Sequence, residues 1–404
     1  MSQLKAKSDI PVLYKQNVAN DLFQLIYVFD MGNNHDKALG TAFDYLEYLG
    51  TSDMTPEELK SEFYRLACTF YVSPGNERTY VVLSGLNENM PAAVQLFEKL
   101  LADAQVNKEA YTNMTSDILK ARSDAKLNQG QNFSRLMSFA MYGPKSPATN
   151  LLTEAELTNM NPQELVDRIH NQNSYKHRIL YYGPSSSKDL LATINQYHQV
   201  PAALKDIPAG NEYAYLETPV TKVLVAPYDA KQIYMAQISN LDKKYDPAIE
   251  PIRALYDEYF GGGMNSIVFQ EMRETRGLAY SAWASIMPPS YLKYPYVLRT
   301  QIATQNDKMI DAVTTFNDII NNMPESEAAF KLAKDGLTNR LRTERIIKGD
   351  IIWSYINAQD LGQNVDPRIK LYNDIQNMSL KDIVDFQKQW VKGRTSVSYT
   401  HLTL

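Results

Sequence analysis

The feature that most constrains the fold of this chain is an internal repeat, because the same order of strand-like and helical segments occurs in both halves. Each half begins with two strand-like runs, continues with two helical segments and a second strand pair, and then adds further helices. A shift of 211 residues places Tyr48–Gly50 on Tyr259–Gly261, and a shift of 219 places Met90–Phe97 on Met309–Phe316. We therefore predict two copies of one domain.

Local patterns predict the individual segments. In the first copy, the first two strands would form a hairpin across residues 15–20. Thr55 and Glu58 stand three residues apart before an apolar-periodic segment, which is typical of a capping box at the start of a helix. In the second copy we expect one regular helix over 265–275, directly before a strand within 278–287.

Strand pairs that alternate with helix pairs, without strict βαβ order, predict two homologous α+β sandwich domains. Each would hold a mostly antiparallel sheet with helices packed on one face. We expect the first domain over 1–205, a linker over 206–216 and the second domain over 217–404, since prolines and Gly210 interrupt regular structure near the boundary. The run VSYTHL matches one reading frame of a sequencing-library adapter, so we expect residues from about 397 not to be native. A terminal strand is the alternative.

Composition excludes several functions. A formal net charge of −5 gives no electrostatic basis for binding nucleic acid. The single cysteine, Cys68, excludes an internal disulfide and a cysteine zinc site, and its apolar strand predicts an inert thiol. No run approaches the roughly 20 apolar residues of a membrane span. The N-terminus lacks the apolar core of a signal peptide, so we expect a soluble chain that begins inside a longer protein, and its compartment stays unassigned.

Motifs for several kinds of active site are missing. The GGGMNS run lacks the Gly-Lys-Ser/Thr ending of a phosphate loop, and no GxSxG nucleophile elbow occurs. No two histidines stand four residues apart, as they would on one face of a zinc-binding helix. We therefore expect surface or capping roles rather than metal ligation for the five histidines, which are His35, His170, His177, His198 and His401.

Arg273 and Tyr280 are the side chains best suited to binding a substrate or assisting catalysis. They stand seven residues apart after three consecutive glycines, so both leave one local region. A guanidinium with five donors and a phenol could hold a peptide carbonyl or stabilise an oxyanion. The alternative is structural, with Arg273 in a surface ion pair with Glu274 and Tyr280 in a half-buried strand.

The stretch GGGMNSIVFQEMRETRGLAYSAWA resembles a signature of the later domains in insulinase/pitrilysin-type zinc metallopeptidases, also called inverzincins, in the form LGGGxSSRLFQxxRExxGLAYSV. The resemblance implies the LuxS/mitochondrial-processing-peptidase-like metallohydrolase fold, with four such domains in two halves around a chamber. It implies zinc on an HxxEH motif in the first domain. Arg273 and Tyr280 match the arginine and tyrosine that reach the bound peptide from a non-zinc domain.

The first copy departs from this zinc motif. Asp44, Glu47 and Tyr48 stand where His, Glu and His would be, and Glu109, Asp117 and Asp124 are undistinguished candidates for the distant third ligand. The resemblance therefore implies the non-catalytic C-terminal half of a long bacterial member, with no metal in this chain. We expect no peptidase activity from the chain alone.

The implied partners are a zinc-bearing catalytic half, on the same polypeptide or a separate subunit, and peptide substrates. Two other interpretations stay open: a non-enzymatic structural subunit of the same fold, and an inactive partner of a separately encoded zinc subunit. Retention of Arg273 and Tyr280 favours a peptidase context, because a structural subunit needs neither side chain.

Overall fold

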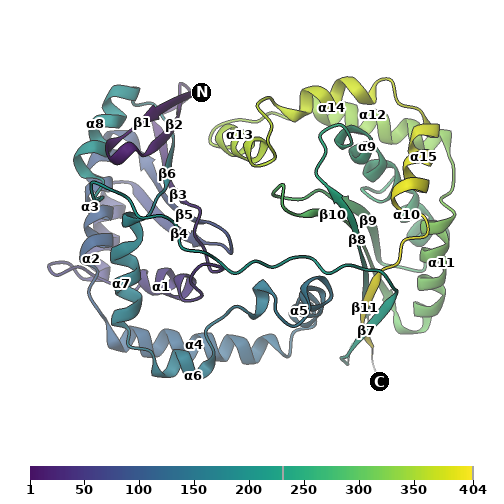
Figure 1. Ribbon diagram of the computed structural model, residues 1–404, viewed down its shortest axis with the longest axis horizontal. Coiled ribbons are helices and arrows are strands. Elements are labelled where there is room, and N and C mark those ends of the chain that lie inside the picture. Colours follow the sequence, from purple (N-terminus) through teal and green to yellow (C-terminus); the bar gives the residue numbers. More distant parts are fainter. Residues whose placement is uncertain (230–231, 403–404) are drawn as a thin grey trace. The chain divides into compact units, whose positions relative to one another are not determined.

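The computed structural model describes residues 1–229 and 232–402, which form two compact units. The first unit consists of residues 1–124, 147–212 and 347–352, and the second of residues 125–146, 213–346 and 353–404. Both units are α+β, each with one sheet and helices packed against it (Figure 1). None of the helices formed by the described residues combines the length and the apolar character needed to cross a bilayer. The linker predicted over 206–216 stays a prediction.

The sheet of the first unit has six strands in the order β1-β2-β6-β3-β5-β4. Only the β2–β6 pair is parallel, so the sheet is mostly antiparallel as predicted. The strands are β1 (Ser2–Lys5), β2 (Pro11–Gln16), β3 (Leu22–Phe29), β4 (Cys68–Pro74), β5 (Thr79–Leu86) and β6 (Arg178–Gly183). The helices are α1 (Leu39–Leu46), α2 (Pro56–Arg65), α3 (Met90–Asp103), α4 (Lys108–Ala125), α6 (Glu154–Asn159), α7 (Gln163–Asn171) and α8 (Ser187–Tyr197).

Burial of one helix stripe against the sheet forms the core of the first unit. Phe29 on β3, Tyr45 on α1 and Phe97 on α3 have almost no solvent exposure, and their burial is a main source of stability. The capping box of α2 is present: the Glu58 N–H donates to Thr55 Oγ1 (3.2 Å), and the Thr55 N–H donates to Glu58 Oε2 (2.8 Å). Both groups satisfy backbone donors that the first helical turn leaves unpaired.

The predicted hairpin between β2 and β3 is wrong. Strand β6 lies between them, parallel to β2 and antiparallel to β3. The local alternation and the short polar connection are compatible with a hairpin. The partner that displaces this pairing comes from a segment about 160 residues later, which no local pattern reveals.

The sheet of the second unit has five strands in the order β7-β11-β8-β10-β9. Its strands are β7 (Lys222–Pro227), β8 (Gln232–Lys244), β9 (Ser281–Met287), β10 (Pro295–Gln305) and β11 (Val397–Leu402). The helices are α5 (Gln129–Tyr142), α9 (Glu250–Phe260), α10 (Ile267–Phe269), α11 (Met309–Asn321), α12 (Glu327–Thr343), α14 (Pro367–Ile375) and α15 (Leu380–Trp390), and α13 (Asp350–Asp360) is divided between the units.

The two sheets share one topology. In each, a late strand enters between two consecutive strands, parallel to the earlier one and antiparallel to the later one. It is β6 between β2 and β3 in the first unit, and β11 between β7 and β8 in the second. Strands β4 and β9 are both edge strands, and they pair with β5 and β10 respectively. This correspondence agrees with the predicted duplication. Residues Val397–Leu402 form β11, residues 403 and 404 lie outside the described residues, and the expectation that residues from about 397 are not native stays a prediction.

The second sheet carries a helix that the repeat does not predict. Helix α5 comes from the first half of the sequence but belongs to the second unit, where Phe133 and Ala140 pack with Ala236 and Ile238 of β8. The neighbouring Met235 points into the main core of the unit, with α9 and α11. Because successive strand residues face opposite sides, α5 covers the sheet face opposite that core.

Candidate functional site

The stretch between α9 and β9 positions the two predicted peptide-binding residues. Helix α9 ends at Phe260, the short helix α10 follows, and its N-cap Ser266 accepts a hydrogen bond from the Phe269 N–H. Gly277, at φ +57°, then reverses the chain. The N–H groups of Leu278 and Ala279 both donate to the Met272 carbonyl, so the segment before β9 folds back onto the preceding helical turn.

Close packing explains the first glycine of the triplet. A Cβ on Gly261 would lie 2.3 Å from the Ala284 carbonyl oxygen and 2.4 Å from the Ala284 nitrogen. Such distances are impossible for a real side chain, so only glycine lets the end of α9 approach β9 this closely. A Cβ on Gly263 would come no nearer than 4.0 Å to another residue. Close packing therefore requires glycine at position 261 but not at position 263.

The regular helix predicted over 265–275 is only partly present. Residues Gln270–Thr275 form a π-helical segment, η5, after the single turn of α10. A π-turn inserts extra chain into one turn and often occurs at functional sites. Here Met272 stays fully buried, while Arg273 beside it points outward.

The structure brings Arg273 and Tyr280 together. The Arg273 guanidinium carbon lies 5.6 Å from the centroid of the Tyr280 ring and 5.1 Å from that of Phe269, within the range of cation–π attraction. Arg273 Nε is 3.6 Å from Glu274 Oε1, a long and exposed ion pair. Tyr280 is 70% exposed and Arg273 46%.

This geometry leaves both polar groups available to a ligand. The guanidinium carbon lies over the Phe269 and Tyr280 rings, and the guanidinium carries five N–H donors in its own plane. The ion pair with Glu274 is the alternative that the sequence raised, but at 3.6 Å and half exposure it is a weak constraint. The pair can therefore present donors to a carbonyl or an oxyanion without losing a strong internal contact.

The degenerate motif positions lie on and just after α1. Asp44 is on the helix, Glu47 is its C-cap and Tyr48 is 46% exposed. Burial, and then the negative charge of Glu47, raise the pKa of Asp44. Within residues 1–229 and 232–402, no group of three or more His, Cys, Asp or Glu side chains could hold a metal ion. The donor set at these positions therefore does not fit zinc.

Sequence reasoning missed a buried ionisable chain in the first unit. Glu98 on α3, His198 after α8 and His177 before β6 are almost fully buried, so the surface role expected for His177 is wrong. His198 Nδ1 lies 2.6 Å from Glu98 Oε1, and the two Nε2 atoms of His198 and His177 lie 2.8 Å apart. Glu98 Oε2 accepts from Asn173 and from the Gln199 N–H.

The hydrogen-bond partners determine where the protons lie in the Glu98–His198–His177 network. The Tyr175 carbonyl can only accept, so His177 Nδ1 donates to it (2.7 Å) and its Nε2 is left as an acceptor. His198 must then donate from Nε2, and one further proton lies between His198 Nδ1 and Glu98. Burial, and next the neighbouring His198, lower the pKa of His177 to about 4. The Glu98–His198–His177 network thus links α3, α8 and β6 through buried hydrogen bonds.

Burial also defines Cys68. Its side chain is buried on β4, and burial raises the pKa of the thiol. A thiol held protonated is a poor nucleophile, which agrees with the inert role predicted for it.

Comparison with known proteins relates these features to one family. Residues 179–337 match the model of the peptidase M16 inactive domain. An uncharacterized zinc protease of Rickettsia felis is 20% identical over 263 residues, which are 62% of this chain and 60% of that protein. The non-peptidase homolog YmxG of Helicobacter pylori is 24% identical over 415 residues, covering 97% of this chain and 90% of that protein.

Solved structures share the fold over the whole chain. The peptidase M16 inactive domain from Pseudomonas fluorescens has a TM-score of 0.78 at 16% identity and covers 100% of this chain and 98% of its own. The periplasmic protease PqqL from Escherichia coli has a TM-score of 0.77 at 13% identity, and the match covers 100% of this chain but 45% of PqqL. The match thus spans less than two thirds of the Rickettsia protease and less than half of PqqL.

Proposed function

This chain belongs to the insulinase/pitrilysin-type metallopeptidase family, and from that premise we propose that it is the non-catalytic half of a zinc endopeptidase. In this proposal the chain closes the chamber and binds the peptide, while hydrolysis occurs at a zinc site in another domain. The length relation to PqqL, of which this chain corresponds to 45%, supports a half-enzyme. The lack of a fitting metal donor set among the described residues is compatible with that division.

The observation that carries the proposal is the Arg273–Tyr280 pair. Two side chains from either end of the η5–β9 turn meet, with the guanidinium beside the phenol ring and both groups exposed. A purely structural arginine would be expected to make a short, well-formed ion pair, and the one ion pair that Arg273 makes among the described residues is 3.6 Å long.

The two groups would act on the peptide carbonyl. As water adds to the scissile carbonyl, negative charge develops on its oxygen, and hydrogen-bond donors already in place stabilise that charge. Arg273 can supply N–H donors and Tyr280 an O–H donor, each worth about 2–4 kcal/mol when well placed. The same contacts hold the substrate backbone in register before the reaction.

The test is to assay the chain together with the zinc-bearing half. Arg273→Ala and Tyr280→Phe should each lower kcat/KM by about 30- to 1,000-fold, which is the rate equivalent of one lost donor. Zinc content, measured by atomic emission, should stay that of the unmodified enzyme. Arg276→Ala is the matched control, because Arg276 lies in the same turn but pairs with Glu271 at 3.2 Å. Unchanged kcat/KM in both test variants would remove the assigned role.

One finding favours a second candidate, an inactive partner of a separately encoded zinc subunit. The non-peptidase homolog of Helicobacter pylori matches this chain over 90% of its own length, so a protein of this size occurs without a fused catalytic half. Genomic sequence around the coding region distinguishes the two. A continuous reading frame with HxxEH supports the half-enzyme, and a neighbouring separate gene with that motif supports the partner.

A further inference from the structure

Strand β4 presents an unpaired edge in the first unit. Its ladder with β5 is bounded by hydrogen bonds from Leu86 N–H to the Ala67 carbonyl and from Gly75 N–H to the Arg78 carbonyl. In the regular antiparallel register between them, odd-numbered residues of β4 bond to β5. The N–H and C=O groups of Cys68, Phe70 and Val72 therefore point away from the sheet. No hydrogen bond to these groups is found among the described residues.

The equivalent edge of the second unit is capped by side chains at Ile286. On β9, the Ile286 N–H donates to Asp257 Oδ1 (2.9 Å), and the Ile286 carbonyl accepts from Arg253 (3.1 Å). Both side chains come from α9. The shift of 211 residues that aligns the repeats places Leu46 and Ala42 of α1 at the positions of Asp257 and Arg253. Apolar side chains cannot cap a strand edge with hydrogen bonds, so the first unit lacks the side-chain cap that the second unit has at Ile286.

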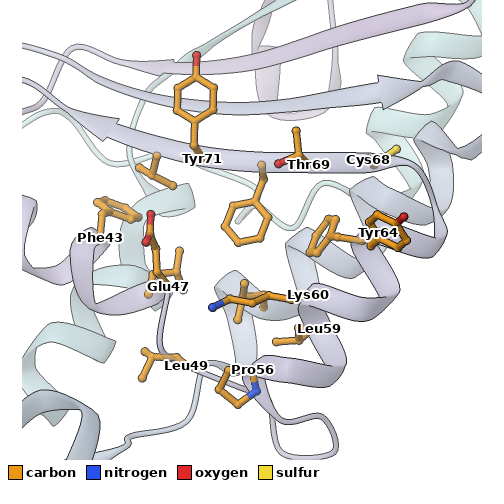
Figure 2. A pocket seen from close by; sticks show the side chains of 15 residues that line it. Phe43, Glu47, Leu49, Pro56, Leu59, Lys60, Tyr64, Cys68, Thr69 and Tyr71 are labelled. Atoms are coloured by element: carbon orange, nitrogen blue, oxygen red, sulfur yellow. The ribbon is translucent and has the colours of Figure 1, made fainter. Parts of the chain in front are cut away.

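A pocket of about 380 Å³ lies directly beside this open edge. Its walls are Phe43 and Leu46 of α1, Leu59 and Phe63 of α2, and Phe70 of β4. Figure 2 shows the strand running across the top of the pocket, with the two helices below it. The pocket and the free main-chain groups therefore form one continuous surface.

Polar and aromatic groups surround the mouth of the pocket. Glu47 comes from the end of α1 and Lys60 from α2, and both side chains point into the pocket in Figure 2. Tyr64 is 88% exposed and Tyr71 50% exposed, and both belong to the pocket lining. Exposed aromatic side chains around an apolar hollow are typical of a binding surface.

We propose that the edge of β4 and the adjoining pocket bind an extended peptide segment, which adds a seventh strand to this sheet. The outward N–H and C=O groups of β4 would pair with the peptide backbone. Alternate peptide side chains would face the pocket, where an apolar one fits between α1 and α2. Glu47 and Lys60 would select a basic and an acidic residue at the ends of the bound segment.

The chemistry of the surface favours an extended peptide over other occupants. A helix satisfies its own backbone groups and would leave the donors and acceptors of β4 unpaired. A compact small molecule could fill the pocket but would not use several main-chain groups spaced along a strand. The site lies in the first unit, whereas Arg273 and Tyr280 lie in the second, so either assignment can fail without the other.

The test uses three fluorescein-labelled forms of one peptide, SRTFTVTES, and fluorescence anisotropy with the full chain. The first form is unmodified. The second is N-methylated at Phe and Val, and the third at the two Thr residues that flank Val. In a strand, these two sets of N–H groups point to opposite sides. We expect saturable binding of the unmodified peptide, binding of one methylated form and loss of the other by more than about tenfold.

Two variants of the chain test the same surface from the protein side. Val72→Pro removes one outward N–H without touching the β4–β5 ladder and should weaken binding about fivefold. Val72→Ala, which keeps that N–H, is its matched control, and circular dichroism confirms that both fold. Glu47→Lys should shift the preference from SRTFTVTES towards SETFTVTES.

Specific outcomes would overturn this proposal. Equal binding of both N-methylated peptides would show a pocket ligand that does not pair as a strand. Concentration-dependent dimers in sedimentation that Val72→Pro abolishes would assign the edge to a second copy of the chain. No binding of the unmodified peptide at any concentration tested, together with an unaltered fold, would leave β4 an ordinary edge strand. Arg273→Ala should leave peptide binding at this site unchanged.

Discussion

At the scale of single residues, the buried Glu98–His198–His177 chain has the largest consequence for stability. A carboxylate and an imidazole without solvent are tolerable only because each is hydrogen-bonded to the other and to its neighbours. The arrangement needs one definite set of protons, and acid that adds another disturbs it. A single substitution in this buried Glu98–His198–His177 network should therefore have a large effect on the stability of the first unit.

Removal of Glu98 should be strongly destabilising. Glu98→Ala leaves His198 without its partner in a buried site, and such losses typically cost about 3–5 kcal/mol of the free energy of unfolding. Urea denaturation followed by circular dichroism measures this quantity. Glu57→Ala on the exposed side of α2 is the matched control and should change it by less than about 0.5 kcal/mol. Similar effects of both substitutions would show that the buried tie contributes little.

Acid should destabilise the first unit through His177. Its pKa is about 4 in the folded protein but near 6.5 when unfolded, so the unfolded state binds more protons between these values. The free energy of unfolding should therefore fall as pH decreases from 6.5 to 4, by on the order of 3 kcal/mol in total. His177→Gln should flatten this dependence in urea denaturation series at several pH values. An unchanged slope in the variant would contradict the assignment.

At the scale of elements, the glycine triplet controls where η5 and β9 meet. Gly261→Ala places a methyl group onto the Ala284 backbone and should destabilise the second unit by about 1–3 kcal/mol or more. It should also displace the turn that carries Arg273 and Tyr280. Gly263→Ala, whose added methyl group would meet no atom nearer than 4.0 Å, should leave stability almost unchanged. Thermal unfolding of both variants measures the difference. Equal stability of the two variants would exclude close packing as the reason for Gly261.

The sequence predicted those elements whose causes are local. The helix start at Thr55, the order of strands and helices, and the inert Cys68 all depend on neighbouring residues. The motif around Arg273 and Tyr280 drew attention to a pair that the fold brings together, although their role in binding stays a proposal. Local signals were sufficient wherever local interactions determine the result.

Long-range features escaped prediction for the same reason. The insertion of β6 between β2 and β3 depends on a segment far along the chain, and His177 and His198 are 21 residues apart without any spacing rule. The π-turn of η5 has no compositional signature, since it differs from a regular helix only in which carbonyl each N–H meets. The position of α5 in the second unit likewise follows from tertiary packing.

At the scale of the whole molecule, the two units should respond oppositely to acid. Burial raises the pKa of Asp257 in the second unit to about 6, which outweighs the effect of Arg253. The folded state then binds more protons than the unfolded state between pH 4 and 6, so acidification stabilises this unit while it destabilises the first. Calorimetry should show the two unfolding transitions shifting in opposite directions between pH 7 and pH 5. A shift of both transitions in the same direction would contradict this difference.

The isolated chain should bind no stoichiometric zinc. Asp44, Glu47 and Tyr48 do not form a fitting donor set, and the described residues contain no other group of three suitable side chains. Atomic emission on the purified chain, after dialysis against zinc and then buffer, measures the retained metal. One tightly held zinc per chain would refute the assignment of hydrolysis to another domain.

The position of β6 also determines the order in which the first unit can be completed during synthesis. Strand β2 joins the sheet through β1 and β6 only, and β6 begins about 160 residues after β2 ends. At a translation rate of about 5–20 residues per second, β2 waits roughly 10–30 seconds for its partner. During that time β2 can pair with β3, its neighbour in the sequence, in a hairpin that is absent from the native sheet. Translation speed and chaperone occupancy over this interval should therefore decide how much of the nascent chain reaches its final strand order.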